Sequence, residues 1–384
     1  PKMSSFTSFP ALLILVLIAG SFAAAVGFSP NNYDSQTYHI PRIYFYLEQG
    51  HLGHFFTTNP RQVFFPFNFN LLQLPVVLFA LPTVCLNVFN VLAYAGIGGF
   101  TYLLSQHYGS SKKFSQLSAF LIMTCTAVLG QASTTNNDIW VAFLLVGAVY
   151  FAVQTFQNKA GHNFMYLMLF LTLAMGTKVT MAFFIPGICV LLLLFRNKVW
   201  QQIKSVKRIV VGILSVLLFT VPCYLINYLE AGAFYPSGQN KFVNKPWELS
   251  TLVEHIGALF LQFVLTPFLE FWYHTFTVFD TIFNTAYKHT LSFYVNRFID
   301  TFWIRPFWEE GHRDKFVYYA GRIISDTPVE DEVWYGFSGL IVLGIATFTT
   351  FKHWRNPLIK ACAILIVSFV FSYVGSMAWQ PWAS

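Results

Sequence analysis

The chain has 384 residues, of which 55% are hydrophobic and only 10% are charged, and its mean hydropathy is +0.54. Soluble domains carry about 25% charged residues, so the composition excludes an ordinary soluble domain and indicates an integral membrane protein. The net charge of +7 does not indicate a nucleic-acid partner, because no zinc-type spacing and no basic groove-reading helix accompanies it. In a membrane protein such an excess reflects lysine and arginine in cytoplasmic loops. The five cysteines lie in apolar runs and are expected to be packing residues.

Runs of apolar residues predict nine membrane-spanning helices. The predicted spans are 9–28, 84–106, 116–132, 138–157, 163–176, 179–195, 209–226, 333–351 and 359–378. The apolar stretch 67–81 is interrupted by Pro75 and followed by Pro82, and is expected to be a short helix at the membrane interface. This pattern predicts an all-α, multi-span membrane protein with a single transmembrane domain over residues 1–384.

The charged residues fix a predicted orientation for these spans. With the N-terminus inside, the cytoplasmic side holds Lys2, Lys112, Lys113, Lys159, Arg196, Lys198, Lys204, Lys207, Arg208, Lys352, Arg355 and Lys360. All 16 carboxylates then fall on the opposite side. Because short cytoplasmic loops are enriched in lysine and arginine, the pattern favours this orientation. Two long extracytoplasmic loops follow from it, at 29–83 and 227–332.

The first long loop opens with YDSQTYHIPR, residues 33–42, which gathers ionisable groups just beyond an uncharged span. Asp34, Tyr38 and Arg42 are four residues apart and share one helix face, and His39 neighbours Arg42. Asp34 is either the cap of the following helix or a general base at the mouth of a lipid-facing cavity. Tyr38 and His39 are candidate substrate-binding residues.

Two arginines of this loop are candidate phosphate ligands. Arg42 is followed by Arg61 in TTNPRQ, and a guanidinium fork matches phosphate oxygens well. The alternative for either arginine is contact with lipid headgroups. Their position in one loop with a candidate base favours a substrate phosphate.

Two further polar stretches stand at the outer ends of spans. STTNND (133–138) places Asn137 and Asp138 at a helix start, where Asp138 either caps the helix or binds a sugar hydroxyl or a divalent ion beside Asp34. GTK (176–178) follows a short span, so Lys178 either snorkels to headgroups or meets the donor phosphate.

The acidic run VEDEVWYGF (329–337) ends the second long loop. Helix-start electrostatics and solvation account for its acids, and the alternative is contact of Glu330 with an acceptor. A divalent metal shared by Asp34 and Asp138 is compatible with the sequence, but no committed ligand set is present. The absence of a serine–histidine–aspartate pattern, a phosphate-cradling glycine loop and an HExxH motif argues against serine hydrolases, cytosolic nucleotide enzymes and zinc proteases.

Taken together, these elements resemble the GT-C superfamily of membrane glycosyltransferases. The stretch YDSQTYHIPRIYFYLEQGHLGHF with TTNPRQ resembles the first outer loop of bacterial multi-span members related to the protein mannosyltransferase and aminoarabinose transferase types. QASTTNND, GTK, INYLEAGAFYP, VEDEVWYGFSG and AWQPW follow in the same order. Family members usually have further spans, so we expect a longer protein after Ser384.

The resemblance implies an enzyme that moves a sugar from a polyprenyl-phosphate donor to an acceptor outside the cytoplasmic (inner) membrane. The acceptor would be a glycan, a lipid or a protein, and membrane lipids would surround the chain. By this resemblance Asp34 is the catalytic base, and Arg42, Arg61 and Lys178 hold the donor phosphate. Inversion at the anomeric carbon is the expected outcome. The alternatives are a ligase or polymerase of lipid-linked glycans, a lipid or solute transporter, and an assembly scaffold.

Overall fold

The computed structural model describes residues 9–157, 161–234, 256 and 336–376, and the fold is described for these residues alone. They form helices without any β-strand, as the sequence predicts. The first half holds α1 (Phe9–Gly27), the π-helix η1 (Ser35–His39), α2 (Ile40–Gln49), α3 (Arg61–Phe64), α4 (Asn68–Leu78), α5 (Cys85–His107), α6 (Lys112–Met123), α7 (Thr126–Gly130) and α8 (Asp138–Gln157). The remainder holds α9 (Gly161–Met175), the 3-10 helix η2 (Val179–Phe184), α10 (Ile185–Leu194), α11 (Arg196–Ile203), α12 (Val206–Phe219), α13 (Val221–Ala231), α18 (Gly336–Lys352) and α19 (Pro357–Ser376).

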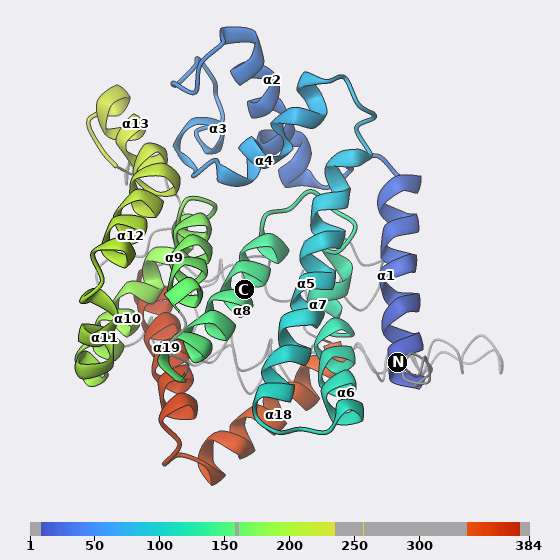
Figure 1. Cartoon of the computed structure of the whole chain (residues 1–384). Coiled ribbons are helices and arrows are strands. Elements are labelled where there is room, and N and C mark those ends of the chain that lie inside the picture. Colours follow the sequence, from blue (N-terminus) through green and yellow to red (C-terminus); the bar gives the residue numbers. More distant parts are fainter. Residues whose placement is uncertain (1–8, 158–160, 235–255, 257–335, 377–384) are drawn as a thin grey trace, which may run out of the picture.

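The long helices form a bundle that is capped at one end by the segment that joins α1 to α5. Helix α5 packs against α1, α6 and α8, and α8 packs against α9, which in turn contacts α12. Helices α2, α3 and α4 lie across the top of this bundle in Figure 1, beyond the end of α1 that is farther from the N-terminus. The predicted interfacial segment 67–81 is α4 of this cap. This arrangement makes the first outer loop a structured lid on the bundle.

The described helices indicate a membrane protein, but several of them are shorter than the spans predicted from the sequence. Phe9–Gly27, Cys85–His107 and Asp138–Phe156 are long and apolar enough to cross a membrane, and only 11–39% of each span is buried inside the protein. Exposed apolar surface on this scale is suited to lipid.

Other predicted spans are broken by local backbone features. The predicted span 209–226 is the pair α12 and α13, bent by 45°, at a break beside Pro222, whose ring nitrogen cannot donate a helical hydrogen bond. The predicted span 116–132 is divided into α6 and α7, and 179–195 begins as the 3-10 helix η2. Five apolar helices of 10–17 residues account for the remaining described segments of this kind.

A core between α5, α6 and α8 holds the beginning of α8 in place. It contains the buried residues Ala93, Tyr94, Ile97, Met123, Ala132 and Ile139. The Tyr94 hydroxyl donates to the carbonyl oxygen of Met123 at 2.9 Å, so the buried phenol is satisfied. Because Ile139 belongs to this core, the adjacent Asp138 is fixed at the capped end of the bundle.

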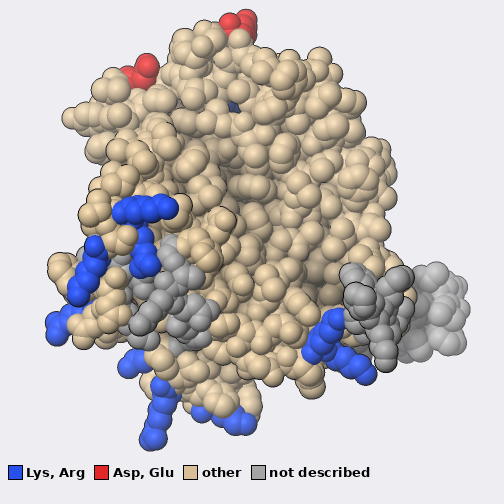
Figure 2. All heavy atoms as spheres, viewed as in Figure 1, with Lys and Arg blue, Asp and Glu red and all other residues tan. Residues whose placement is uncertain are grey.

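Cations predominate at one end of the bundle among the described residues, although Arg42, Arg61 and Lys178 belong to the capped end. On the face shown in Figure 2, most of the visible lysine and arginine side chains lie over the lower half, and the visible acids lie at the upper edge. Lys112 and Lys113 begin α6, and Lys352 ends α18, both at the bundle end opposite the cap in Figure 1.

Candidate active site

Asp34 lies at the entrance of η1 and does not act as a side-chain cap. Its carboxylate makes no capping hydrogen bond to the helix that follows, so the capping interpretation is wrong. A π-turn at this point is notable because such turns are rare and frequent at functional sites. The carboxylate instead contacts the side chains of Tyr38 and Arg61.

Pro41 accounts for the way the rest of the loop docks beside Asp34. As a proline in the first turn of α2 it has no N–H to donate to the carbonyl of Thr37, four residues earlier. The Thr37 oxygen accepts instead from Asn59 Nδ2 at 3.2 Å and from Gln62 Nε2 at 2.7 Å. This freed carbonyl ties α3 to the Asp34 helix.

Docking of α3 brings Arg61 onto Asp34. Arg61 Nη1 lies 3.3 Å from Asp34 Oδ1, and the two side chains are 32% and 25% exposed. Tyr38 donates its hydroxyl to Asp34 Oδ2 at 2.8 Å, and the Arg61 guanidinium lies 5.9 Å from the centre of the Tyr38 ring. Each oxygen of the carboxylate therefore has a partner, and the group still reaches solvent.

The second and third polar stretches meet the first at this place. The hydroxyls of Ser35 and Thr135 are hydrogen-bonded, which ties the loop before α8 to the residue after Asp34. Asn137 Nδ2 donates to the carbonyl of Thr177 at 3.1 Å, and Lys178 forms an ion pair with Asp138. The structure thus brings together three stretches that lie about 100 and 40 residues apart in the chain.

Gly176 allows the turn before Lys178 to pack against α4. Its carbonyl accepts from the backbone N–H of Asn68 at 2.9 Å, and Asn68 Nδ2 donates to the carbonyl of Phe219 at 2.6 Å. A Cβ at position 176 would overlap both Asn68 Nδ2 and the Phe219 oxygen. The close backbone approach therefore requires glycine.

Arg42 lies beneath the site rather than in it. The side chain is fully buried, and its guanidinium donates to the carbonyls of Gln62, of Arg61 at 2.7 Å and of Pro66 at 3.2 Å. Burial lowers the pKa of Arg42, but guanidinium groups stay protonated in proteins. Arg42 therefore holds the segment 61–66 in place. The predicted contact of Arg42 with the donor phosphate is wrong for this conformation, because the guanidinium is buried.

His39 is buried next to Arg42 and is neutral. Burial, and secondarily the charge of Arg42, lower its pKa to about 3. Its Nδ1 lies 3.3 Å from Asn70 Nδ2, which also donates to the His39 carbonyl. Because Asn70 can only donate from that nitrogen, Nδ1 accepts and Nε2 carries the proton. His39 is 1% exposed, so the structure places it behind the surface that Asp34 and Arg61 form.

Burial shifts the pKa values of Tyr38 and Lys178, two ionisable groups near Asp34. Burial raises the pKa of Tyr38 well above its ordinary value, and the charge of Asp34 raises it further, so the phenol keeps the proton that it donates. Burial lowers the pKa of Lys178 to about 8, while the charge of Asp34 opposes that shift. Lys178 is therefore close enough to Asp34 to respond to its charge and is readily neutralised near physiological pH.

The two carboxylates of the site are paired with protein cations and are not arranged with further ligands as a metal site among the described residues would require. Over the part of the chain that the structure describes, His, Cys, Asp and Glu form no group of three or more suited to a metal. Asp34 and Asp138 are each paired with a protein cation. Glu330, the last predicted site residue, lies outside the described residues.

Several amide side chains of the site were not identified from sequence. Asn59, Gln62 and Asn70 join segments of the cap to one another, and Asn68 joins the cap to the end of α12, through the hydrogen bonds given above. A sequence feature that could have identified them is an amide residue inside an apolar run, as in FPFNFNLLQLP. Such an amide is expected to be buried, and a buried amide needs hydrogen-bond partners.

Comparison with known families places this geometry in context. Residues 66–226 match the family model described as dolichyl-phosphate-mannose-protein mannosyltransferase. The matched range contains Asn137, Asp138 and Lys178 and excludes Asp34 and Arg61. No curated protein and no solved structure matches the chain.

Proposed function

We propose that this chain is a membrane glycosyltransferase of the GT-C type, as the family match over residues 66–226 supports, and that it transfers a sugar from a polyprenyl-phosphate donor to an acceptor outside the cytoplasmic membrane. The observation that carries the proposal is the meeting of two carboxylate–cation pairs, Asp34–Arg61 and Asp138–Lys178, at one end of the bundle. A lipid-linked donor would bring its phosphate to this end while its tail stays among the spans.

Asp34 is the general base of the proposed reaction. It is partly exposed and its two oxygens are oriented by Arg61 and Tyr38. The incoming acceptor hydroxyl loses its proton to Asp34 as its oxygen attacks the anomeric carbon. The bond between the sugar and the phosphate oxygen breaks on the opposite face, so the configuration inverts.

Arg61 and Lys178 stabilise the leaving group. Negative charge grows on the lipid phosphate as the glycosidic bond breaks, and cations fixed at that position supply the largest stabilisation. Without donor, each cation is neutralised by a carboxylate. A phosphate competes with those carboxylates, so donor binding also frees Asp34 to act as a base.

Neighbouring residues position these groups. Arg42 holds the segment that carries Arg61 from below, through the carbonyls of Arg61 and Pro66. Asn70 of α4 donates to the carbonyl of His39. Asn137 fixes the turn before Lys178. Asp138 orients the sugar of the donor once Lys178 turns to the phosphate.

The proposed orientation follows from the charge distribution. Cations gather at the bundle end opposite the cap (Figure 2), which we assign to the cytoplasm by the positive-inside rule. The N-terminus is then inside, and the capped end with Asp34 faces outward.

The test uses the purified chain in lipid nanodiscs with a radiolabelled polyprenyl-phosphate mannose. We expect release of polyprenyl phosphate as the mannose is transferred to water in the absence of an acceptor, and a raised donor KM with a lowered kcat in Arg61→Met and Lys178→Met. The matched control is Lys352→Met, which removes a cation at the other end of the bundle and should leave both constants unchanged. Equal activity of all three variants would contradict the assignment.

A further inference from the structure

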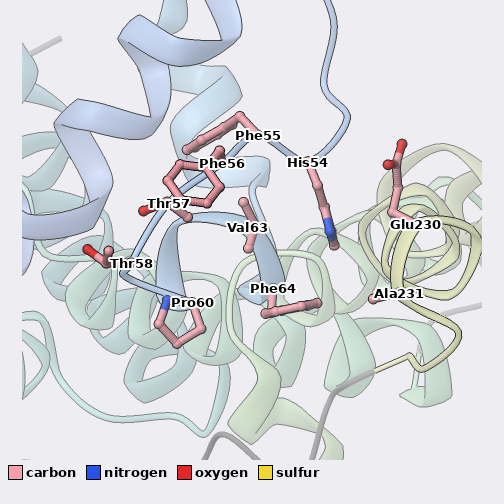
Figure 3. Close-up of a pocket in the computed structure, with 10 residues that line it drawn as sticks. All are labelled: His54, Phe55, Phe56, Thr57, Thr58, Pro60, Val63, Phe64, Glu230 and Ala231. Carbon is pink, nitrogen blue, oxygen red and sulfur yellow. The ribbon is translucent and has the colours of Figure 1, made fainter.

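We propose that an outward-facing pocket beside α3 binds the saccharide part of an acceptor, an inference that rests on the proposed glycosyl transfer. The pocket has a volume of about 690 Å³, within the range of about 300–1,000 Å³ typical of small-molecule sites. Figure 3 shows it between the segment 54–60, α3 and the end of α13. The residues that carry the argument are His54, Phe55, Phe56, Thr58 and Glu230. We call it the arm pocket.

Aromatic side chains form one part of the arm pocket. Phe55 stacks on Phe45 with ring centres 4.4 Å apart, so its ring is held in place. Phe56 is 96% exposed and has no stacking partner among the residues that the structure describes, so a large apolar face is open. The C–H groups of a pyranose ring carry partial positive charge and suit the negative face of an aromatic ring.

Hydrogen-bonding groups lie on either side of these rings, with Thr58 on one side and His54 and Glu230 on the other (Figure 3). Glu230 is exposed at the end of α13 and has no ion-pair partner among the residues that the structure describes. A carboxylate accepts several hydrogen bonds, as vicinal sugar hydroxyls supply. The hydroxyl of Thr58 adds a donor and acceptor at the rim, and His54 is held by Asn227 Oδ1, 2.9 Å from its Nε2.

The carboxylate of Glu230 in the arm pocket favours an uncharged acceptor over the phosphate-bearing donor. The donor carries a phosphate anion, which a carboxylate repels, and no lysine or arginine lines the pocket. A neutral, hydroxyl-rich acceptor has no such conflict. The donor enters from the bilayer through its lipid tail, whereas the arm pocket is lined by the cap segment 54–60, α3 and the end of α13.

The arm pocket shares one short helix with the catalytic pair. Pro60, Val63 and Phe64 line the pocket, while Arg61 of the same segment contacts Asp34. Thr57 donates to Gln62 Oε1 at 2.7 Å, and Gln62 donates onward to the Thr37 carbonyl. The pocket and Asp34 thus contact the same short segment, so a saccharide held in the pocket can extend a terminal hydroxyl toward Asp34.

The experiment measures saccharide binding directly, by isothermal titration of the full chain in nanodiscs with maltotetraose, mannotetraose and chitotetraose. We expect at least one tetrasaccharide to bind, and Phe56→Ala and Glu230→Gln each to weaken it about tenfold, as loss of one good contact implies. The matched controls are Phe351→Ala, which removes another exposed phenylalanine, and Glu48→Gln, which removes another exposed carboxylate. Both controls should bind as the wild type does.

The outcomes separate this inference from the proposed function. No binding of any tetrasaccharide, or binding that neither pocket variant weakens, would overturn the arm pocket as a saccharide site. Asp34→Asn should bind the saccharide normally, because Asp34 does not line the pocket. If Asp34→Asn also retained full transfer, the catalytic assignment would fail while the binding result stood. In transfer assays the pocket variants should raise the acceptor KM and leave hydrolysis of the donor by water unchanged.

Discussion

Replacing Arg42 with leucine tests whether this residue supports the site or binds the donor. The guanidinium is fully buried and donates to three backbone carbonyls between residues 61 and 66. Each buried acceptor left without a donor costs about 1–3 kcal/mol. Leucine also removes the desolvation cost of burying a charged guanidinium, and this gain offsets part of the loss. We therefore expect a loss of about 3–5 kcal/mol in the stability of the cap.

The assay combines thermal unfolding, followed by tryptophan fluorescence in nanodiscs, with limited proteolysis of the segment 50–66. Arg42→Leu should unfold at a lower temperature and expose this segment to protease. Arg61→Met is the matched comparison, because Arg61 is 32% exposed and contacts a carboxylate rather than the backbone. It should melt near the wild-type temperature while losing activity. An Arg42→Leu variant with a normal melting temperature and a selectively raised donor KM would refute this reasoning and make Arg42 a phosphate ligand.

Three further variants test the site. Gly176→Ala should lower the thermal stability and the activity together, because its Cβ overlaps Asn68 and the Phe219 carbonyl; an unchanged melting curve would show that the backbone approach is not needed. Lys178 is charged below its pKa of about 8 and neutral above it, so kcat/KM should fall as pH rises through 8. Lys178→Arg should move that limb to higher pH, and an identical pH profile would exclude Lys178 as its source. Tyr38→Phe removes the hydrogen bond to Asp34 and should lower kcat roughly ten- to hundredfold without a change in melting temperature; a wild-type kcat would exclude that role.

Local sequence features predicted the helical class and the stretches that meet at the site. Asp34, Asp138 and Lys178 each follow or precede an apolar run, so the sequence alone indicates that they lie at helix ends on one side. The pairing of Asp138 with Lys178 could not be predicted, because it depends on how α8 and α9 pack. The bend between α12 and α13 was missed although Pro222 signals it.

The burial of Arg42 shows the limit of sequence reasoning most clearly. Its position on the Asp34 face of the helix suggested exposure to substrate. The segment 61–66 packs over the Arg42 side chain. Gln62 positions this segment by donating to the Thr37 carbonyl, which lacks a helical donor because of Pro41. That contact joins residues 20 or more positions apart, and no local pattern reports it.

The most direct test of the central claim is single-turnover transfer by Asp34→Asn, with binding of the labelled polyprenyl-phosphate mannose measured on the same sample. Asparagine keeps the size of the side chain but cannot accept the proton. The account predicts that Asp34→Asn binds the donor at least as well as the wild type and transfers no sugar. Transfer at the wild-type rate, at equal protein concentration, would contradict it.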